Sequence, residues 1–216
     1  MNETWNSTEK FNHEASVWDS DPRRRELAMA VAQAIINETH PSKNMHALEA
    51  GCGTGLVTLE IAPLVNRLTA VDTSIEMLHI LQEKITTLHV DAIETQCLDL
   101  SSPAASFEHA RSFDLIYSSM TLHHISDTAG FIGRISNMLA PGGIIAIADL
   151  DREDGLFHDD PAEEVHHGFD RTELTAMMQM AGLEVTSFKT IYVVSKKNRE
   201  EKMAAYPVFL CTATKK

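Results

Sequence analysis

At residues 48–55 the chain reads Leu48-Glu49-Ala50-Gly51-Cys52-Gly53-Thr54-Gly55, and this stretch decides the fold. Its three glycines stand at alternate positions, between an apolar run at residues 45–48 and a helix-like run at residues 56–62. Glycine permits the φ angles of a tight turn, and its missing Cβ lets a ligand approach the backbone closely. The stretch therefore predicts a strand, a turn with bare N–H groups, and a helix that opens beside a bound molecule.

Outward from this stretch, strand-like and helix-like segments alternate, which predicts the βαβ units of a parallel sheet. Strands are expected at residues 45–50, 67–71, 92–98, 113–118 and 143–150. Helices are expected at residues 54–64, 74–88, 127–139 and 171–181, with a short or irregular piece near 104–109. Two β-rich runs follow at residues 183–195 and 206–214, and the short link between them predicts an antiparallel pair.

Three residues are expected to mark helix starts. Ser74 and Asp170 have side chains that suit the N-cap position. Pro22 suits a first helical position, and it predicts a helix ahead of the core that runs to about residue 37.

The bulk composition limits the class of protein. A chain of 216 residues with 44% hydrophobic residues fits one globular domain with a substantial core. The chain has no apolar run of about 18 residues for a membrane span, and its polar N-terminus lacks the pattern of a signal peptide. Three widely separated cysteines favour neither a disulfide framework nor a zinc cluster, so a cytoplasmic protein is expected. A net charge of −13 disfavours nucleic acid as a partner.

The spacing of the glycines is similar to that of a known family. After the acidic Glu49, the pattern G-x-G-x-G resembles motif I of the class I S-adenosylmethionine (SAM) methyltransferases. The dinucleotide fingerprint G-x-G-x-x-G/A would need a small last residue where this chain has Leu56. A nicotinamide enzyme and a plain glycine turn are the alternatives. The resemblance implies an α/β, Rossmann-like fold: a seven-stranded, mostly parallel sheet with an antiparallel last strand and helices on both faces.

The resemblance also implies SAM as the cofactor and gives roles to three carboxylates at strand ends. Asp72 would accept from both ribose hydroxyls, Asp99 from the adenine amino group, and Glu49 would face the ammonium group of the ligand. Three carboxylates repel one another in an empty crevice, and a cationic sulfonium relieves that repulsion. Ordinary loop caps are the alternative for Asp72 and Asp99. The residues expected to bind the cofactor are Glu49, Gly51, Cys52, Gly53, Asp72, Thr73, Met77, Asp99, Leu100 and Ser118.

Two further stretches extend the resemblance over residues 45–150. Residues 113–125 are similar to the family's motif IV and the loop after it, and residues 139–143 to the turn before the fifth strand. Where DNA and RNA amino-methyltransferases carry [Asn/Asp]-Pro-Pro-aromatic, this chain has Ser118-Ser119-Met120-Thr121. This departure disfavours base methylation. The turn at residues 139–143 resembles that of many small-molecule methyltransferases, and a small-molecule methyl acceptor is expected.

His123, in the loop after the fourth strand, is the candidate catalytic residue. Methyl transfer from a sulfonium is an in-line displacement, in which the protein mainly aligns the acceptor and excludes water. A hydroxyl or amine acceptor also needs a base, whereas a thiolate or enolate needs little help. His123 and its neighbour His124 are not expected both to point into one cavity.

Two segments outside the core are expected to border the acceptor. Phe11, Ala15 and Trp18 form an apolar stripe at i, i+4 and i+7, which predicts either a lid over the acceptor site or a stripe packed on the core. Residues 151–169 are rich in acidic residues and histidines and are expected to form a solvated flap. Because they lack a fixed ligand spacing, no metal site is expected. The residues expected to contact substrate are Phe11, Trp18, His124, His167 and Phe169.

The sequence thus predicts a single methyltransferase domain with three parts. These are an N-terminal lid and helix at residues 1–40, a SAM-binding core at 41–150, and an acceptor-side flap, helix and terminal antiparallel pair at 151–216. One alternative keeps the fold but makes the acceptor a protein or RNA. A second is a non-catalytic SAM-binding or partner-binding protein, and a third is a nicotinamide-dependent oxidoreductase.

Overall fold

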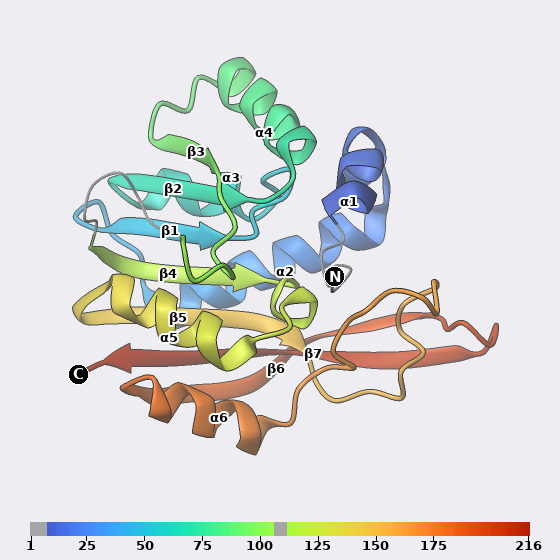
Figure 1. The fold of residues 1–216 in the computed structure, drawn as a ribbon. Coiled ribbons are helices and arrows are strands. Elements are labelled where there is room, and N and C mark those ends of the chain that lie inside the picture. The colour runs from blue at the N-terminus through green and yellow to red at the C-terminus, as the bar shows by residue number, and fades with distance from the viewer. Residues whose placement is uncertain (1–7, 106–111) are drawn as a thin grey trace.

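A seven-stranded sheet forms the centre of the computed structural model, which describes residues 8–105 and 112–216 (Figure 1). The strands lie in the order β3-β2-β1-β4-β5-β7-β6. Neighbours from β3 to β5 pair in parallel, and β7 pairs antiparallel with both β5 and β6. The expected Rossmann-like architecture is confirmed, including the antiparallel last strand. The strand bounds are β1 His46–Ala50, β2 Arg67–Asp72, β3 Ile93–Cys97, β4 Phe113–Ser119, β5 Leu139–Leu150, β6 Leu183–Lys197 and β7 Met203–Lys215.

Helices cover both faces of the sheet because alternate strand residues point to opposite sides. Leu48 and Ala50 belong to the core beneath α5 (Thr128–Met138) and α6 (Arg171–Met180). Ala47 belongs to the core on the other face. The helices of that face are α2 (Pro22–Thr39), α3 (Thr58–Ile61) and α4 (Ile75–Leu88). The N-terminal segment, α1 (Thr8–Glu14) and the 3₁₀ turn η1 (Ala15–Ser20), packs against α4 (Figure 1).

Three helices begin where their first residues predict. Ser74 and Asp170 each accept a hydrogen bond from a backbone N–H in the first turn of α4 and α6. Asp21 does the same for α2, in which Pro22 is the first residue. Each bond satisfies an N–H group that has no partner inside its own helix.

Some element boundaries differ from the sequence expectation. Residues 54–57 form turns and a bend, so that α3 starts only at Thr58. It ends at Ile61, where the 3₁₀ turn η2 (Ala62–Leu64), which contains Pro63, follows. β5 starts at Leu139 instead of residue 143, because Leu139 already pairs with Phe113 of β4. The glycine turn, where Gly142 has a φ of 77°, forms an irregularity within this pairing. β7 starts at Met203, ahead of the expected residue 206. In the piece expected near 104–109, residues 106–109 lie outside the described residues.

The flap, residues 151–169 between β5 and α6, contains no helix, and its ends lie side by side. The N–H of Arg152 donates to the carbonyl of Phe169, and the N–H of Glu153 donates to the carbonyl of His167, both at 3.0 Å. Inside the flap, Oε2 of Glu153 accepts from the N–H of Gly155 at 2.8 Å. Figure 1 shows the flap beside the part of the β6–β7 hairpin that extends from the sheet.

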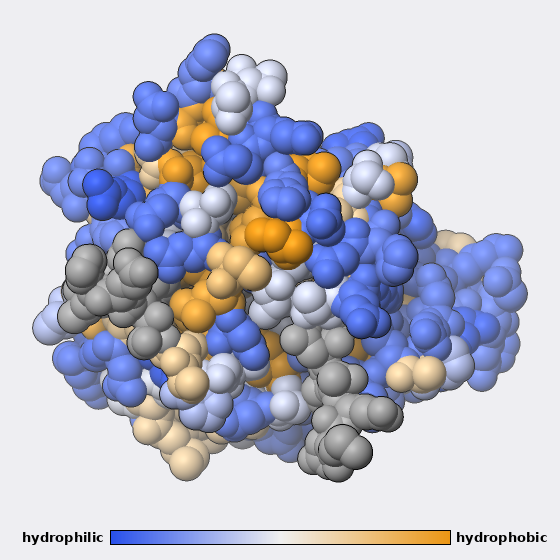
Figure 2. Space-filling view, turned by 45° about the horizontal axis from the view of Figure 1, so that its top comes forward, coloured by the Kyte–Doolittle hydropathy of each residue, from blue (hydrophilic) through white to orange (hydrophobic). Residues whose placement is uncertain are grey.

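The surface is consistent with the charged composition. The face drawn in Figure 2 is mostly hydrophilic, with apolar side chains gathered toward its centre. Within residues 8–105 and 112–216, none of the helices combines the length and the apolar character that crossing a bilayer requires.

Candidate functional site

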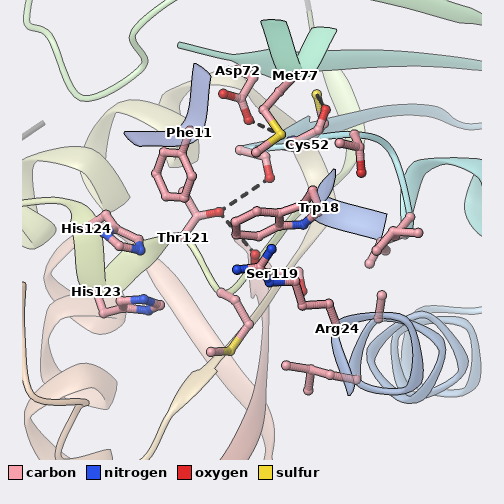
Figure 3. A pocket seen from close by; sticks show the side chains of 18 of the residues that line it. Phe11, Trp18, Arg24, Cys52, Asp72, Met77, Ser119, Thr121, His123 and His124 are labelled. Atoms are coloured by element: carbon pink, nitrogen blue, oxygen red, sulfur yellow. Dashed lines mark hydrogen bonds between the residues drawn. The ribbon is translucent and has the colours of Figure 1, made fainter. Parts of the chain in front are cut away.

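A cavity of about 980 Å³ opens at the carboxyl ends of β1, β2 and β4, where ligands of such sheets bind. Its glycine-loop end is formed by parts of residues 49–57, 71–77 and 98–101. Its flap end is formed by α1, η1, the start of α2, the 3₁₀ turn η3 (Leu122–His124), the flap and β6. Figure 3 shows Asp72, Met77 and Cys52 together at one end, with His123 and His124 on a wall away from them.

The glycine loop has the backbone geometry that its sequence predicts. Gly51 has a φ of 77°, and a Cβ there would meet Oγ1 of Thr121 at 2.2 Å. Gly53 has a φ of 52°, yet a Cβ there would meet nothing within 4 Å, so its backbone is open to the cavity that it lines. The N–H of Gly53 donates to Oδ2 of Asp72 at 2.7 Å. This bond fixes the loop to the end of β2.

Asp72 and Asp99 both line the glycine-loop end, from two different strand ends. Oδ1 of Asp72 accepts from the N–H of Ser74 at 2.9 Å. Burial raises the pKa of Asp72, and hydrogen bonds from the backbone of Ser74 and Gly53 partly offset that effect. Oδ1 of Asp99 accepts from the N–H of Ser101 at 2.8 Å and from its hydroxyl at 2.6 Å. Asp99 is therefore held by a residue close to it in the sequence, whereas Asp72 is held both by the nearby Ser74 and by Gly53 of the glycine loop.

Glu49 lies beneath the glycine loop and is 1% exposed. Its Oε2 accepts from the hydroxyl of Thr58 at 2.6 Å and from that of Tyr117 at 2.9 Å. Burial, with a smaller contribution from the charge of Asp72, raises the pKa of Glu49 to about 8 in spite of these two bonds. Glu49 is thus protonated at neutral pH, and a cation placed in the cavity would favour its ionised form.

The N-terminal segment contributes residues of α1 and η1 to the lining of the cavity. The ring of Phe11 meets the ring of Trp18 edge-on at 5.7 Å between centroids, and the ring of His124 at 5.2 Å. Asp19 accepts from the hydroxyl of Thr54 at 2.6 Å, which joins the segment to the glycine loop. Because Phe11 and Trp18 both line the cavity, the geometry favours a lid over a stripe that only packs on the core.

Both His123 and His124 line the cavity, although only one was expected to (Figure 3). The 3₁₀ turn η3 brings their ring centroids to 4.1 Å from each other. Nδ1 of His123 lies 2.7 Å from Oδ1 of Asp149, whose side chain is fully buried. This contact places the proton of a neutral His123 ring on Nδ1. Burial, followed by the neighbouring His123 and His158, lowers the pKa of His124 well below its ordinary value.

The sequence expectations missed Lys10, His158 and Glu163 at the flap end, and the buried Asp149 that contacts His123. The Glu163 side chain is only 6% exposed, and its Oε2 lies 2.7 Å from Nζ of Lys10 and 3.3 Å from Nδ1 of His158. Hydrogen bonds from His158 and Lys10 lower the pKa of Glu163 to about 2, against the effect of burial. The acidic and histidine-rich composition of the flap was a signal for such a site, but no spacing marked which residues face inward.

Of the ten residues expected to bind the cofactor, nine line the glycine-loop end. The exception is Ser118, which is 1% exposed and donates its hydroxyl to the carbonyl of Ala50 at 2.8 Å. Ser119 lines the cavity in its place, because successive strand residues point to opposite sides.

Two of the residues expected to contact substrate lie elsewhere, whereas Phe11, Trp18 and His124 do line the flap end. Phe169 is 7% exposed and belongs to the core beneath α5 and α6. His167 is exposed and packs against Gly155, where a Cβ would meet its ring at 2.9 Å. The expectation that these two residues reach the pocket mouth is corrected, because the paired ends of the flap hold them away from it.

Metal binding was the other possibility weighed for the flap. No group of three or more His, Cys, Asp or Glu residues could hold a metal ion within the described ranges, 8–105 and 112–216. The three histidines of the flap end pack against one another in tilted and edge-on arrangements, with His158 at 5.1 Å from His123 and 5.6 Å from His124 between ring centroids.

Comparisons with known sequences agree on one family. A family model described as a methyltransferase domain matches residues 22–188. An uncharacterized methyltransferase of Schizosaccharomyces pombe is 27% identical over 158 residues, which cover 71% of this chain and 55% of the relative. A ubiquinone biosynthesis O-methyltransferase of Caulobacter sp. is 31% identical over 133 residues, which cover 59% of this chain and 50% of the relative. The chain thus spans about half the length of these curated relatives.

Comparison with solved structures agrees with the fold. The N-methyltransferase NodS of Bradyrhizobium japonicum, solved with S-adenosyl-L-homocysteine (SAH), superposes with a TM-score of 0.70 over 99% of each chain. The two sequences are 21% identical, so this likeness shows the fold alone.

Proposed function

Because this chain belongs to the methyltransferase-domain family, we propose that it transfers a methyl group from SAM to a small-molecule acceptor. The proposal rests on one observation: the glycine loop and the carboxylates of Glu49, Asp72 and Asp99 line the same end of one cavity. Such an end suits a ligand that combines a cationic group, a ribose and an adenine ring.

The residues at the glycine-loop end fit this cofactor. The open backbone at Gly53 leaves room for close approach, and Asp72 beside it suits the ribose hydroxyls. Asp99 suits the adenine amino group, and Glu49 is a buried carboxyl whose ionised form a cation would stabilise. The proposed cofactor-binding residues are Glu49, Gly51, Cys52, Gly53, Asp72, Thr73, Met77, Asp99 and Leu100, with Ser119 in place of Ser118.

The flap end supports a small molecule as the acceptor. When bound, SAM supplies an activated methyl group, so the protein has to align the acceptor and exclude water. Phe11 and Trp18 line the cavity with their rings in edge-on contact, which suits an enclosed acceptor, whereas a protein or RNA acceptor would need an extended open surface. The name of the Caulobacter relative places it in the biosynthesis of ubiquinone, itself a small molecule, which supports the same class.

His123 is the proposed base for an acceptor that has to lose a proton. Its Nδ1 is engaged by the buried carboxylate of Asp149, so Nε2 carries the lone pair of the neutral ring. A carboxylate that orients an imidazole in this way is a recurring arrangement in general-base catalysis. In this proposal Asp149 is a positioning residue, since it acts through His123.

Isothermal titration tests the cofactor part of the proposal. SAM and SAH should bind with dissociation constants on the order of micromolar, and NAD and NADP should not bind. If SAH does not bind, or if NAD binds more tightly than SAH, the cofactor assignment fails.

A transfer screen tests the acceptor part. The protein is incubated with SAM and a library of small amines, alcohols, phenols and thiols, in parallel with peptide and RNA pools, and SAH formation is measured. Turnover with a small molecule is expected. Turnover only with peptide or RNA would replace the acceptor class, and tight SAH binding without any turnover would favour a non-catalytic SAM-binding protein.

A further inference from the structure

Two buried polar atoms at the flap end have no hydrogen-bond partner among the described residues. They are Oε1 of Glu163 and Nε2 of His158. Both residues line the cavity, and the Glu163 side chain is only 6% exposed. Leaving a buried carboxylate oxygen unpaired is unfavourable, so native proteins rarely do it without a functional reason. A partner that arrives with a ligand would remove this penalty.

The remaining contacts of the two side chains decide what kind of ligand group fits. Oε2 of Glu163 is engaged by Nζ of Lys10 at 2.7 Å and by Nδ1 of His158 at 3.3 Å. Since Nδ1 of His158 faces a carboxylate, the proton of the neutral ring lies there, and Nε2 is an acceptor. Nδ1 of His124 lies 3.9 Å from Oε1 of Glu163, which is too far for a hydrogen bond. Both unpartnered atoms are therefore acceptors, and the ligand has to bring the donors.

The charge of the flap end favours a donor that is also a cation. Hydrogen bonds from His158 and Lys10 hold the pKa of Glu163 at about 2, so it is ionised at neutral pH. Carboxylates outnumber cations among the described residues that line this end. The carboxylates are Glu14, Asp21, Glu26, Asp159, Asp160 and Glu163. The cations are Lys10, Arg23, Arg24 and Lys196.

We propose that Glu163 and His158 form a subsite for a protonated amine of the acceptor molecule. The proposal rests on the proposed function, because it locates the amine at the acceptor side of the same cavity. The ammonium group donates to Oε1 of Glu163 and to Nε2 of His158, and the rings of Phe11, Trp18 and Phe157 border the space for an apolar body beside it.

Three probes of the same shape and different charge test the subsite. The full chain is saturated with SAH and titrated near neutral pH with benzylamine, benzyl alcohol or benzoate. Benzylamine should bind about tenfold more tightly than benzoate. Glu163→Gln should weaken benzylamine binding about tenfold and leave benzyl alcohol within about twofold. Glu164→Gln is the matched control, because it removes the same charge from the exposed neighbouring position. Equal affinities for benzoate and benzylamine, or equal behaviour of the two variants, would overturn the proposal.

Lys10→Met separates a binding subsite from a simple latch between α1 and the flap. If Glu163 recognises an amine, removing the competing ammonium of Lys10 should tighten benzylamine binding about threefold or more. If the Lys10–Glu163 pair only holds the lid closed, Lys10→Met should weaken benzylamine binding as Glu163→Gln does, and the proposal is overturned. The affinity of the unaltered protein for SAH distinguishes a failure of the subsite proposal from a failure of the proposed function. SAH binding without an amine preference overturns the subsite alone, and absent SAH binding overturns the proposed function.

Discussion

The glycine-loop end and the flap end of the cavity are built in different ways. At the glycine-loop end, Asp72 is bonded to the nearby Ser74 and Asp99 to the nearby Ser101. The flap end depends on contacts between distant parts of the chain, such as Lys10 with Glu163. Apart from Thr54, which donates to Asp19, the bonds described at the glycine-loop end stay within that end, as between Gly53 and Asp72, so its geometry can be kept while the contacts of Glu163 change. The two ends should therefore respond separately to substitution.

The largest expected effect concerns the buried acid of the glycine-loop end. Burial raises the pKa of Glu49 to about 8 from an ordinary value of 4.5. Its neutral form stabilises the fold below about pH 4.5, and this contribution is lost as the pH rises toward 8. The side chain of Glu49→Gln cannot ionise, so the variant does not lose this contribution. From about pH 5 to pH 8.5, the free energy of unfolding of the variant relative to the parent should rise by an amount on the order of 4 kcal/mol.

Urea unfolding at the two pH values measures this difference. Glu60→Gln, an exposed position on α3, is the control and should show little change. A pH-independent difference for Glu49→Gln would mean that the pKa of Glu49 is not raised by burial, and the contrast between the two ends would weaken.

The next effect concerns His123 at the flap end. His123→Ala should lower the free energy of unfolding by about 3 kcal/mol, because the fully buried Asp149 loses its imidazole partner and, among the described residues, keeps only backbone N–H donors. Affinity for SAH, measured by titration, should stay within about twofold, since the glycine loop is untouched. Adding Asp149→Asn should recover part of the lost stability, and His79→Ala, at an exposed position, should be neutral. A large loss of SAH affinity in His123→Ala would show that the two ends of the cavity do not respond separately.

Asp72→Ala, unlike His123→Ala, should weaken SAH binding. It removes the proposed ribose acceptor and the bonds that hold Gly53 and Ser74, and should weaken SAH binding by roughly 1.5–3 kcal/mol. Titration against Asp91→Ala, an exposed control, measures the loss. In the same variant, the affinity of the flap end for benzylamine should be unchanged. Unchanged SAH affinity would remove the ribose assignment.

The smallest effect is expected for Asp99→Asn, which keeps the shape of the side chain. Ser101 engages Oδ1, and the other oxygen is the proposed acceptor for the adenine amino group. The amide should weaken SAH binding by about 1 kcal/mol. An SAH analogue with inosine in place of adenosine lacks the amino group, so it should bind the two proteins alike. If Asp99→Asn weakens binding of the analogue as much as binding of SAH, Asp99 is only a loop cap.

The glycine-loop end could be predicted from the sequence because its information is local. Gly51, Gly53 and the acidic strand ends stand at fixed positions after each strand, and parallel strands bring their carboxyl ends to one edge. The family resemblance they carried is confirmed by the family model over residues 22–188. The helix starts at Ser74 and Asp170 were also predictable, since capping depends on neighbours in sequence.

The flap end could not be predicted in the same way. Glu163 is one of several acidic residues in the flap, and its contacts with His158 and with Lys10, which is far away in the sequence, distinguish it. Phe169 was expected at the pocket mouth but is buried in the core, because backbone pairing with Arg152 decides its position. Irregular segments take their shape from contacts that no local pattern encodes.

The strand order has a consequence for the synthesis of the chain. β7 follows β6 in the sequence yet lies between β5 and β6 in the sheet, and in the described residues β6 pairs with β7 alone. A ribosome therefore completes all of β6 before the strand that joins it to the sheet exists. Until residues 203–215 emerge, β5 presents an unpaired edge that contains Ile145 and Ile147, and such edges are prone to aggregation. A product that stops before β7 would leave that edge of β5 uncovered and β6 detached from the sheet.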